Sequence, residues 1–435
     1  MSIGYMSEKT GIDVLVIGGG AAGMMACLQA ASFGARTVLL EKNEKLGKKI
    51  YITGKGRCNV TNTAENDEFF RQIPRNPKFL YSALSGFGKE ELLAILSENG
   101  TQTKIERGGR VFPVSDRASD VTRALTRAIE RADARIWLQS PVVSVSPENG
   151  QIAVQLRSGE RLTAAACVVA TGGISYPSTG STGDGYRFAE ETGHCLVNPR
   201  GALVPLVADA EWPKLLQGIS LKNVRLSAWM KKKKLYDELG EMLFTHFGYS
   251  GPLILECSSH LPDELSDVKL FLDMKPGLDT EQVEARILRE VAGMPRRQLA
   301  SLLQTMLPQR MAPLFAELCG LDPHLPAGSL DRSGRRRLTE AFKALPLPLL
   351  EFRPVEEAIV TRGGVSVRDV APNTMMSRHC PGLFFAGEVL DVDAHTGGFN
   401  LQIAFSTGAL AGKNAASYSM TLRGETVQES GKASV

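Results

Sequence analysis

Apolar residues along this chain follow three patterns, and each pattern predicts a different kind of element. A run of branched apolar residues at 14–17 predicts a short buried strand, and the alanine- and methionine-rich stretch 22–32 predicts a helix after it. Polar and apolar residues alternate at 224–230 and 241–245, which predicts antiparallel strands. From residue 279 onward, apolar residues recur at helical spacing. The chain is therefore predicted to combine an α/β fold with an antiparallel sheet and a helical module.

These patterns divide the chain into three predicted parts. The α/β pattern covers residues 1–200 and resumes over 352–435, so this domain is expected to be discontinuous. A β-rich domain is expected over 201–278 and 328–351, with a helical module at 279–327. The polar tail after Arg423 is expected to be disordered. In the helical module, one predicted face carries Val283, Ile287, Leu288 and Val291, and another carries Leu299, Leu302, Leu303 and Met306.

The first predicted strand ends in a glycine-rich turn at residues 18–23. Such a turn leaves room for a pyrophosphate, and the N-terminus of the following helix carries partial positive charge that would face this anion. A second strand, 38–40, ends at an acid that suits ribose hydroxyls. Because strand, glycines, helix, strand and acid follow in order within one short unit, the sequence predicts a dinucleotide site, for NAD or FAD. Its candidate residues are Gly18, Gly20, Ala21, Ala22, Gly23, Glu41 and Lys42.

A segment near the C-terminus favours FAD over NAD. Residues 383–386 predict a short buried strand that ends in a glycine and an acid able to bond a polyol. A glycine loop at 395–398 then leads into a helix of small residues, 403–411, which can lie close to the nucleotide fold. Unpaired N–H groups at the start of that helix would face the pyrimidine end of a flavin, where negative charge gathers on reduction. The predicted flavin contacts are Gly387, Glu388, Asp391, Gly398, Phe399, Asn400 and Leu401.

The loop 47–62 combines basic and amide side chains with three glycines. Such donors on a flexible backbone can reach both phosphates and the edge of a flavin, although a solvated basic turn is the alternative. Cys58 is expected to be a packed small side chain, because no histidine is paired with it in the sequence. The residues of this loop assigned to the cofactor are Gly47, Lys48, Thr53, Gly54, Gly56, Arg57, Cys58 and Asn59.

The motifs taken together resemble a known family. Besides the first glycine turn, they are TGKGRCNVTN at 53–62, RVFP at 110–113, ATGG at 170–173 and GFNLQ at 398–402. Over nearly its whole length the chain resembles bacterial FAD flavoproteins grouped with aminoacetone oxidase and bile-acid enone reductase. It is more distantly similar to fumarate-reductase-type flavoproteins. The expected fold is a Rossmann-like FAD-binding domain of the glutathione/fumarate-reductase type, split by an inserted antiparallel β domain. The predicted cofactor site also includes Val142, at the start of a meander, and Thr171 and Gly172, after the strand that returns beneath the cofactor.

Composition agrees with a large enzyme and argues against several other classes. The 435 residues are 43% hydrophobic, and the net charge of +3 is too mild to demand nucleic acid or a membrane as partner. The 6% aromatic content and two short basic runs, 231–234 and 335–337, also argue against RNA; a hairpin tip and a helix face are expected there. No apolar run reaches the ~20 residues of a spanning helix, and Met1–Thr10 lacks a leader pattern, so a cytoplasmic protein is expected. Seven cysteines without a C-x-x-C pair indicate neither a disulfide scaffold nor a metal site.

The predicted activity is that of an FAD-dependent oxidoreductase that passes hydride through flavin N5. The resemblance implies either NAD(P)H-dependent reduction of an activated C=C bond or similar small acceptor, or oxidation of a small amine by O₂; the first is preferred. No second complete dinucleotide motif is visible, so NAD(P)H would bind transiently. His246 and His395 are the candidate catalytic residues, with a structural histidine or plain exposure as the alternatives. A flavin redox sensor and an RNA-modifying flavoprotein are more distant alternatives, and the oligomeric state is left open.

Overall fold

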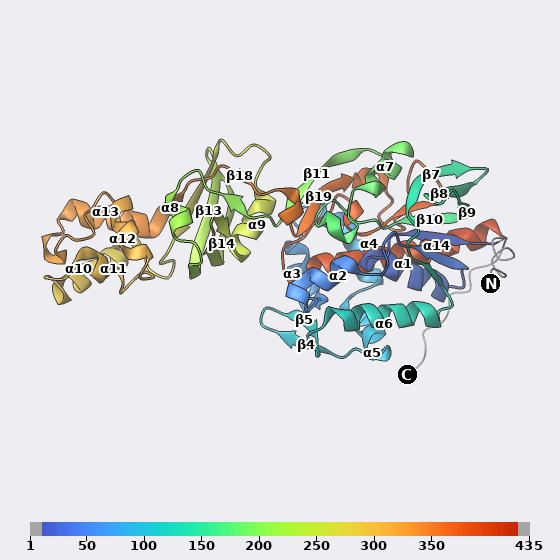
Figure 1. Cartoon of the computed structure of the whole chain (residues 1–435), viewed down its shortest axis with the longest axis horizontal. Helices are drawn as coiled ribbons and strands as arrows, with labels where there is room; N and C mark the ends of the chain where they lie inside the picture. The colour runs from blue at the N-terminus through green and yellow to red at the C-terminus, as the bar shows by residue number, and fades with distance from the viewer. Residues whose placement is uncertain (1–10, 425–435) are drawn as a thin grey trace. The chain divides into compact units, whose positions relative to one another are not determined.

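The computed structural model describes residues 11–424, which form two compact units (Figure 1). Within the described residues, unit 1 comprises 11–201 and 359–424, and unit 2 comprises Ala202–Ala358. The segment Met1–Thr10, for which no leader was expected, and the tail after Arg423, expected to be disordered, lie outside the described residues except for Gly424. Each unit has its own hydrophobic core. Unit 1 consists of two separate stretches of the chain, and the α/β domain was expected over 1–200 and 352–435.

A five-stranded parallel sheet forms the centre of unit 1, in the order β20-β10-β1-β2-β6. The strands β1, β2, β10 and β20 are buried throughout, as expected of a parallel sheet covered on both faces. The residues Ile136 and Trp137, which the sequence placed in a meander, instead belong to this sheet. The strand bounds are β1 Val14–Ile17, β2 Thr37–Leu40, β6 Arg135–Trp137, β10 Ala166–Val169 and β20 Leu383–Phe385.

The helices α1 (Ala21–Ser32) and α14 (Phe399–Leu422) pack directly against each other. A Cβ atom added at Gly408 would lie 2.2 Å from the Ala22 carbonyl oxygen, and one at Gly412 would lie 2.2 Å from that of Ala26. Only glycine permits this approach, because any side chain would collide with the backbone of α1. The prediction that small residues bring the last helix close to the nucleotide fold is confirmed.

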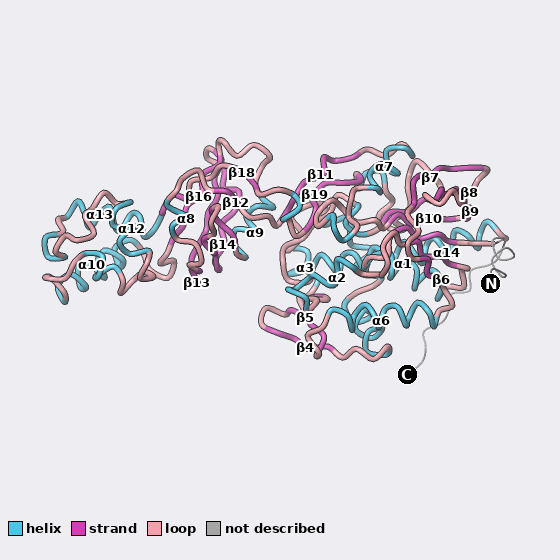
Figure 2. Tube along the Cα trace, viewed as in Figure 1, coloured by secondary structure: helices cyan, strands magenta, loops and turns pink. Residues whose placement is uncertain are grey.

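Smaller elements surround this core of unit 1 (Figure 2). A three-stranded antiparallel sheet, β3-β5-β4, follows the basic loop, and a second, β7-β8-β9, contains the predicted meander. A two-stranded sheet joins β11 to β19. The helices are α2 Lys48–Ile52, α3 Asn66–Arg71, α4 Tyr81–Gly86, α5 Lys89–Glu98, α6 Ala118–Arg131 and α7 Asp184–Glu191; the strands are β3 Thr61–Asn62, β4 Thr103–Glu106, β5 Arg110–Pro113, β7 Val142–Glu148, β8 Gln151–Leu156, β9 Arg161–Ala164, β11 Leu196–Ala202 and β19 Val360–Val365.

Unit 2 is built on a seven-stranded antiparallel sheet in the order β17-β16-β13-β14-β15-β12-β18. The predicted strand 241–245 is part of a longer strand, β14, because Gly240 continues the ladder opposite Val224. The basic run 231–234 lies at the turn of the β13–β14 hairpin, as predicted. The strand bounds are β12 Leu206–Val207, β13 Ser220–Met230, β14 Lys233–Phe244, β15 Gly248–Ser250, β16 Val268–Asp273, β17 Leu345–Leu347 and β18 Glu351–Phe352.

Helices complete unit 2. Val283 and Ile287 are buried as predicted, but Leu288 is 44% exposed, because it is turned about 100° around the helix from Ile287. The segment 328–351, expected to be β-rich, contains a helix that Asp331 caps by accepting a bond from the Gly334 N–H at 2.6 Å.

No helix in residues 11–424 is long and apolar enough to cross a membrane. The helix bounds are α8 Trp212–Leu215, α9 Pro252–His260, α10 Thr280–Gly293, α11 Leu299–Leu303, α12 Met311–Leu318 and α13 Arg332–Ala344.

Candidate functional site

The glycines of the turn between β1 and α1 have two different tasks. Gly18 has φ +103°, and a Cβ there would lie 2.5 Å from the Ala170 carbonyl oxygen. A Cβ at Gly23 would lie 1.8 Å from the Gly18 carbonyl oxygen. Gly20 caps α1, and a Cβ at that position would meet nothing within 4 Å. Two glycines thus permit close packing, while the third leaves open space at the N-terminus of the helix, where a pyrophosphate would be held.

Glu41 lies buried at the end of β2, beside this turn. Its Oε2 accepts a hydrogen bond from the Gly19 N–H at 2.6 Å, and its Oε1 accepts bonds from the backbone and side-chain nitrogens of Asn43 at 2.7 and 2.6 Å. A carboxylate has about four acceptor positions, so one further hydroxyl can bind. The neighbouring Lys42 forms an ion pair with Asp184 at 2.7 Å.

The structure distributes the residues of the 47–62 loop over different partners. Lys48 pairs with Glu44 at 2.9 Å. Arg57 pairs with Glu106 and Asp116, and its guanidinium lies over the Phe112 ring, 4.2 Å from the centroid. These two predicted cofactor residues therefore already have protein partners. Gly47, Gly54 and Gly56 all have positive φ, at 69°, 57° and 87°, and Thr53 donates to the Ile50 carbonyl oxygen.

Cys58 is fully buried in unit 1. Desolvation raises the pKa of its thiol to about 12, so the group stays protonated and cannot act as a thiolate nucleophile. The expectation of a packed small side chain is confirmed. All seven cysteines of the chain lie in the described part and are free thiols.

Two buried side-chain oxygens in the predicted cofactor set have neither a hydrogen-bond partner nor an ion-pair partner among the described residues. They are Asn59 Oδ1 and Thr171 Oγ1. Asn59 Oδ1 faces Gly398, where an added Cβ would lie 3.0 Å from it. Thr171 follows β10 and precedes Gly172, which has φ +76°. Because buried polar atoms in folded proteins are nearly always satisfied, both atoms are consistent with a polar ligand.

Glu388 joins segments that are far apart in the sequence. It lies in the turn after β20, where Gly387 has φ +78°. Its carboxylate accepts hydrogen bonds from Lys49 Nζ at 2.8 and 2.6 Å, from Ser175 Oγ at 2.9 Å and from the Thr361 N–H at 2.8 Å. Lys49 lies in the basic loop that the sequence singled out, whereas Ser175 and Thr361 carried no local signal. These three residues belong to the candidate site.

The N-terminus of α14 presents unsatisfied N–H groups and lies before the predicted helix 403–411. The helix begins at Phe399 after Gly398, and the Gln402 N–H already donates to the Gly398 carbonyl oxygen at 3.2 Å. The first three N–H groups, those of Phe399, Asn400 and Leu401, are therefore the ones that α14 itself cannot satisfy. The side chain of Asn400 donates to the Ala394 carbonyl oxygen at 2.7 Å and fixes the preceding loop.

The basic loop and the start of α14 meet directly. Thr61 Oγ1 donates to Gln402 Oε1 at 2.7 Å, and Asn62 Nδ2 donates to the Gly397 carbonyl oxygen at 2.9 Å. A Cβ added at Gly398, whose φ is +100°, would lie 2.4 Å from the Thr61 carbonyl oxygen. Two motifs that are more than 300 residues apart in the sequence thus form one side of the site.

Charged residues gather in the loop before α14. Asp391 accepts a hydrogen bond from Asn76 Nδ2 at 3.0 Å and lies 3.7 Å from Arg75. Asp393 is 1% exposed, and desolvation raises the pKa of its carboxyl to about 6, against the opposing effect of Arg75 and Arg362. Desolvation likewise lowers the pKa of the Arg362 guanidinium to about 10, with Arg200 acting in the same direction. The loop is therefore held by a buried set of opposite charges.

The two candidate catalytic histidines lie in different units. His395 is half-buried in unit 1, and its Nδ1 lies 3.1 Å from Gln72 Oε1. Since an amide oxygen only accepts, Nδ1 carries the proton in this contact. His246 is exposed in unit 2, between β14 and β15, with its ring centroid 4.9 Å from that of Phe247. Val142 begins β7 opposite Leu156. Roles in catalysis or cofactor binding remain predictions for all three.

The residues of unit 1 fit FAD. The open space at Gly20, the carboxylate of Glu41, the unsatisfied oxygens of Asn59 and Thr171, and the N-terminus of α14 are all features that a flavin dinucleotide would use. Among the described residues, no cluster of His, Cys, Asp and Glu could hold a metal ion.

A family model described as HI0933-like protein Rossmann domain matches residues 12–414. The chain belongs to this family. It is 32% identical over 406 residues to a 3-dehydro-bile acid delta(4,6)-reductase of Clostridium scindens, covering 92% of this chain and 98% of that protein. It is 30% identical over 402 residues to a ribosomal RNA dihydrouridine synthase of Escherichia coli, covering 91% and 96%. A protein with the same description in Haemophilus influenzae is also 30% identical, over 90% and 96%.

Two solved structures match most of this chain at low sequence identity. A flavocytochrome c3 fumarate reductase in an open conformation matches with TM-score 0.46 and 18% identity, covering 94% of this chain and 78% of that one. A 3-ketosteroid-delta4-(5alpha)-dehydrogenase of Rhodococcus jostii matches with TM-score 0.48 and 17% identity, covering 95% and 98%. By its family, the protein is an FAD-dependent Rossmann oxidoreductase, so this prediction is confirmed.

Proposed function

We propose that this flavoenzyme reduces an activated C=C bond of a small molecule with electrons from NADH or NADPH. The observation that carries the proposal is the 32% identity to a bile-acid delta(4,6)-reductase over 98% of that protein's length. The names of the two kinds of curated relative describe a reductase and an enzyme that makes dihydrouridine. In both cases the chemistry is addition of a hydride and a proton across a C=C bond conjugated to a carbonyl.

The residues of unit 1 have distinct tasks in such a reaction. FAD, when bound, supplies the hydride transfer. The N–H groups at Gly20 and the start of α1 would hold its pyrophosphate, and Glu41 would hold its ribose. The N–H groups of Phe399, Asn400 and Leu401 favour negative charge beside them, because they add direct hydrogen bonds to the dipole of α14.

A proton donor is also required, and we propose His395 for this task. Its Nδ1–H donates to Gln72 Oε1, which fixes the ring, and it lies directly before the glycine loop that leads into α14. In its imidazolium form the ring keeps the Nδ1–H on Gln72 and can deliver the proton on Nε2 to a substrate carbon, which leaves a neutral imidazole. His246 is the second candidate, and it lies exposed between β14 and β15 of unit 2.

The experiment is anaerobic reduction of the purified, FAD-loaded protein. NADH or NADPH is expected to bleach the flavin, and a 4-en-3-one steroid is expected to restore its colour while the C=C bond is consumed. Bleaching by an aminoketone but by neither nicotinamide would support the alternative of amine oxidation by O₂. Bleaching by none of these donors would refute the proposal.

A second candidate is reduction of a uridine in RNA. It is favoured by the two relatives named ribosomal RNA dihydrouridine synthase, each covered over 96% of its length. Mass spectrometry of ribosomal RNA from cells with and without the gene tests it: loss of one dihydrouridine is the expected result, and an unchanged modification pattern would exclude it.

A further inference from the structure

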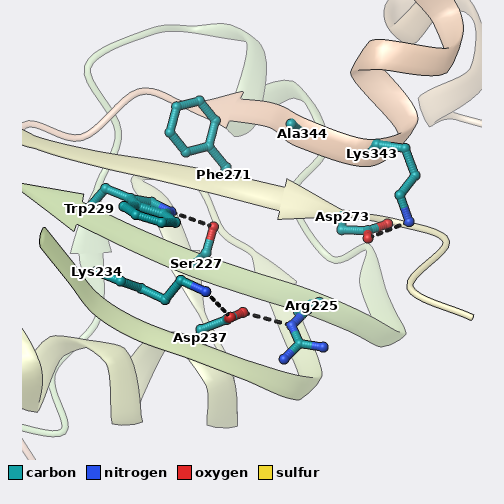
Figure 3. Close-up of a pocket in the computed structure, with 9 residues that line it drawn as sticks. All are labelled: Arg225, Ser227, Trp229, Lys234, Asp237, Phe271, Asp273, Lys343 and Ala344. Atoms are coloured by element: carbon teal, nitrogen blue, oxygen red, sulfur yellow. Dashed lines mark hydrogen bonds and ion pairs between the residues drawn. The ribbon is translucent and has the colours of Figure 1, made fainter. Parts of the chain in front are cut away.

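The solvent-facing side of the unit 2 sheet carries a pocket (Figure 3). Along β13, Val224, Leu226 and Ala228 are buried, while the alternating residues 225, 227 and 229 point to the other side. The pocket is therefore a feature of the outer face of the sheet and not a gap in the core. It is lined by Arg225, Ser227, Trp229, Lys234, Asp237, Phe271, Asp273, Lys343 and Ala344.

Two aromatic rings lie on adjacent strands of this face. Phe271 on β16 is directly opposite Ser227 on β13, and Trp229 is two residues further along β13. Such diagonal neighbours are about 7–8 Å apart, within reach of aromatic side chains. The indole Nε1 of Trp229 donates to Ser227 Oγ at 3.2 Å, which holds the ring against the sheet. Both rings are only partly buried, so part of each ring is accessible to a ligand.

Cations surround the two rings. Arg225 and Lys234 each pair with Asp237, at 2.7 and 2.6 Å, and Lys343 pairs with Asp273 at 2.7 Å. Lys234 also lies over the Trp229 ring, with Nζ 5.1 Å from the centroid. The side chains of Arg225 and Lys234 are 50% and 46% exposed. Ion pairs this close to solvent contribute only about 0.2–1 kcal/mol, so phosphates can compete for these two cations.

Further lysines extend the positive charge beyond the pocket. Lys269 is exposed and lies opposite Trp229 in the β13–β16 ladder. The exposed run Lys231–Lys234 forms the hairpin tip at the end of β13. Aromatic surfaces among cations are the arrangement by which proteins bind single-stranded nucleic acid, with bases stacked on the rings and phosphates on the cations.

We propose that this face of unit 2 binds a single-stranded RNA segment, with bases on Trp229 and Phe271 and phosphates at Arg225, Lys234 and Lys269. The carboxylates of Asp237 and Asp273 favour RNA over DNA, because they only accept hydrogen bonds and the ribose 2′-hydroxyl can donate one. This inference goes beyond the proposed reaction, because RNA binding by unit 2 does not depend on reduction of a C=C bond. It can be measured without turnover.

The test is binding of a fluorescein-labelled single-stranded RNA of about 12 nucleotides to the full-length, FAD-loaded protein, followed by fluorescence anisotropy at several salt concentrations. Trp229→Ala and Phe271→Ala are each expected to weaken binding about tenfold, while Trp229→Phe retains most of it. Lys234→Gln is expected to weaken binding and to reduce the slope of log affinity against log salt by about 0.7. Lys234 is exposed, so this variant tests the proposal even where loss of the indole disturbs the fold.

Two variants serve as matched controls. Tyr81→Ala removes an aromatic side chain that is 52% exposed in unit 1, and Arg336→Gln removes an exposed cation on α13. Both are expected to bind RNA as the parent protein does. Enone turnover of every variant is recorded in parallel, so failure of the reaction and failure of RNA binding are separate results. The proposal is overturned when Trp229→Ala and Phe271→Ala bind like the parent. It is also overturned when single-stranded DNA or polyglutamate competes as well as RNA.

Discussion

The two units of this protein differ in whether charged side chains lie in their interiors. Among residues 11–424, every buried charged residue belongs to unit 1: Asp13, Glu41, Arg362, Asp391 and Asp393. In unit 2 the only buried polar residues are Ser258, Ser259 and Thr339, and its ion pairs, apart from Lys343–Asp273, lie nearer to solvent.

A buried charge costs free energy unless it is paired and hydrogen-bonded. Several buried charged side chains are therefore not expected in a core that binds no polar ligand. The difference indicates that the interior of unit 1 is organised around a polar ligand. The interior of unit 2 is organised by packing alone, and its chemistry lies on its surface.

The largest expected effect comes from a glycine inside unit 1. Gly23→Ala places a Cβ 1.8 Å from the Gly18 carbonyl oxygen, so α1 must move away from β1. We expect a loss of about 3 kcal/mol or more in the free energy of unfolding. Urea denaturation and hydrogen exchange in α1 measure it.

The matched control is Gly293→Ala in unit 2, where a Cβ meets nothing within 4 Å at the exposed end of α10. This change is expected to be neutral or to stabilise by up to about 1 kcal/mol. If Gly23→Ala and Gly293→Ala changed the free energy of unfolding equally, the close packing inferred at Gly23 in unit 1 would be contradicted.

A substitution at a second glycine of unit 1 is expected to weaken FAD binding without changing the stability of the fold. Gly20→Val adds a side chain to open space, at an extended φ of −80°, so the fold is expected to survive. The same side chain fills the predicted pyrophosphate position. We therefore expect FAD affinity to fall at least ~100-fold, about 2.7 kcal/mol, with an unchanged urea midpoint of the apoprotein. Full FAD occupancy in this variant, measured by flavin absorbance after reconstitution, would show that the pyrophosphate does not bind at this turn.

A smaller effect is expected from the pH dependence of Asp393. Its pKa is raised in the folded protein to about 6, so the folded state holds the proton more tightly than the unfolded chain. The stabilisation is present at low pH and is lost as pH rises through 6. Between about pH 5 and about pH 7.5 this loss amounts to about 1 kcal/mol.

Asp393→Asn is expected to remove this part of the slope. Urea denaturation at a series of pH values compares the two proteins. The same slope in both would show that the carboxyl titrates normally.

The smallest effect is expected at the surface of unit 2. Arg225→Gln breaks the 2.7 Å ion pair with Asp237, but the arginine side chain is 50% exposed. The change in the free energy of unfolding is therefore expected to stay within about 0.5 kcal/mol. A loss of more than about 2 kcal/mol in the same urea assay would mean that unit 2 depends on charge as unit 1 does.

The sequence by itself determined the parts of the protein whose signals are local. The β1–turn–α1 unit with Glu41, the small-residue helix α14 and the β13–β14 hairpin all follow from the spacing of nearby residues. Backbone sterics and hydrogen bonding act over a few residues, so these elements can be predicted from short segments.

Only the tertiary structure decided which side chains face each other. Lys49 and Glu388 are 339 positions apart, and nothing in either segment indicates that Lys49, and not Lys48, makes the ion pair. The 6% aromatic content argued against a nucleic-acid surface, yet the β13–β16 ladder brings Trp229 and Phe271 to one face. The physical reason is that burial, ion pairing and shared faces depend on register and packing between distant segments, and local sequence does not encode these.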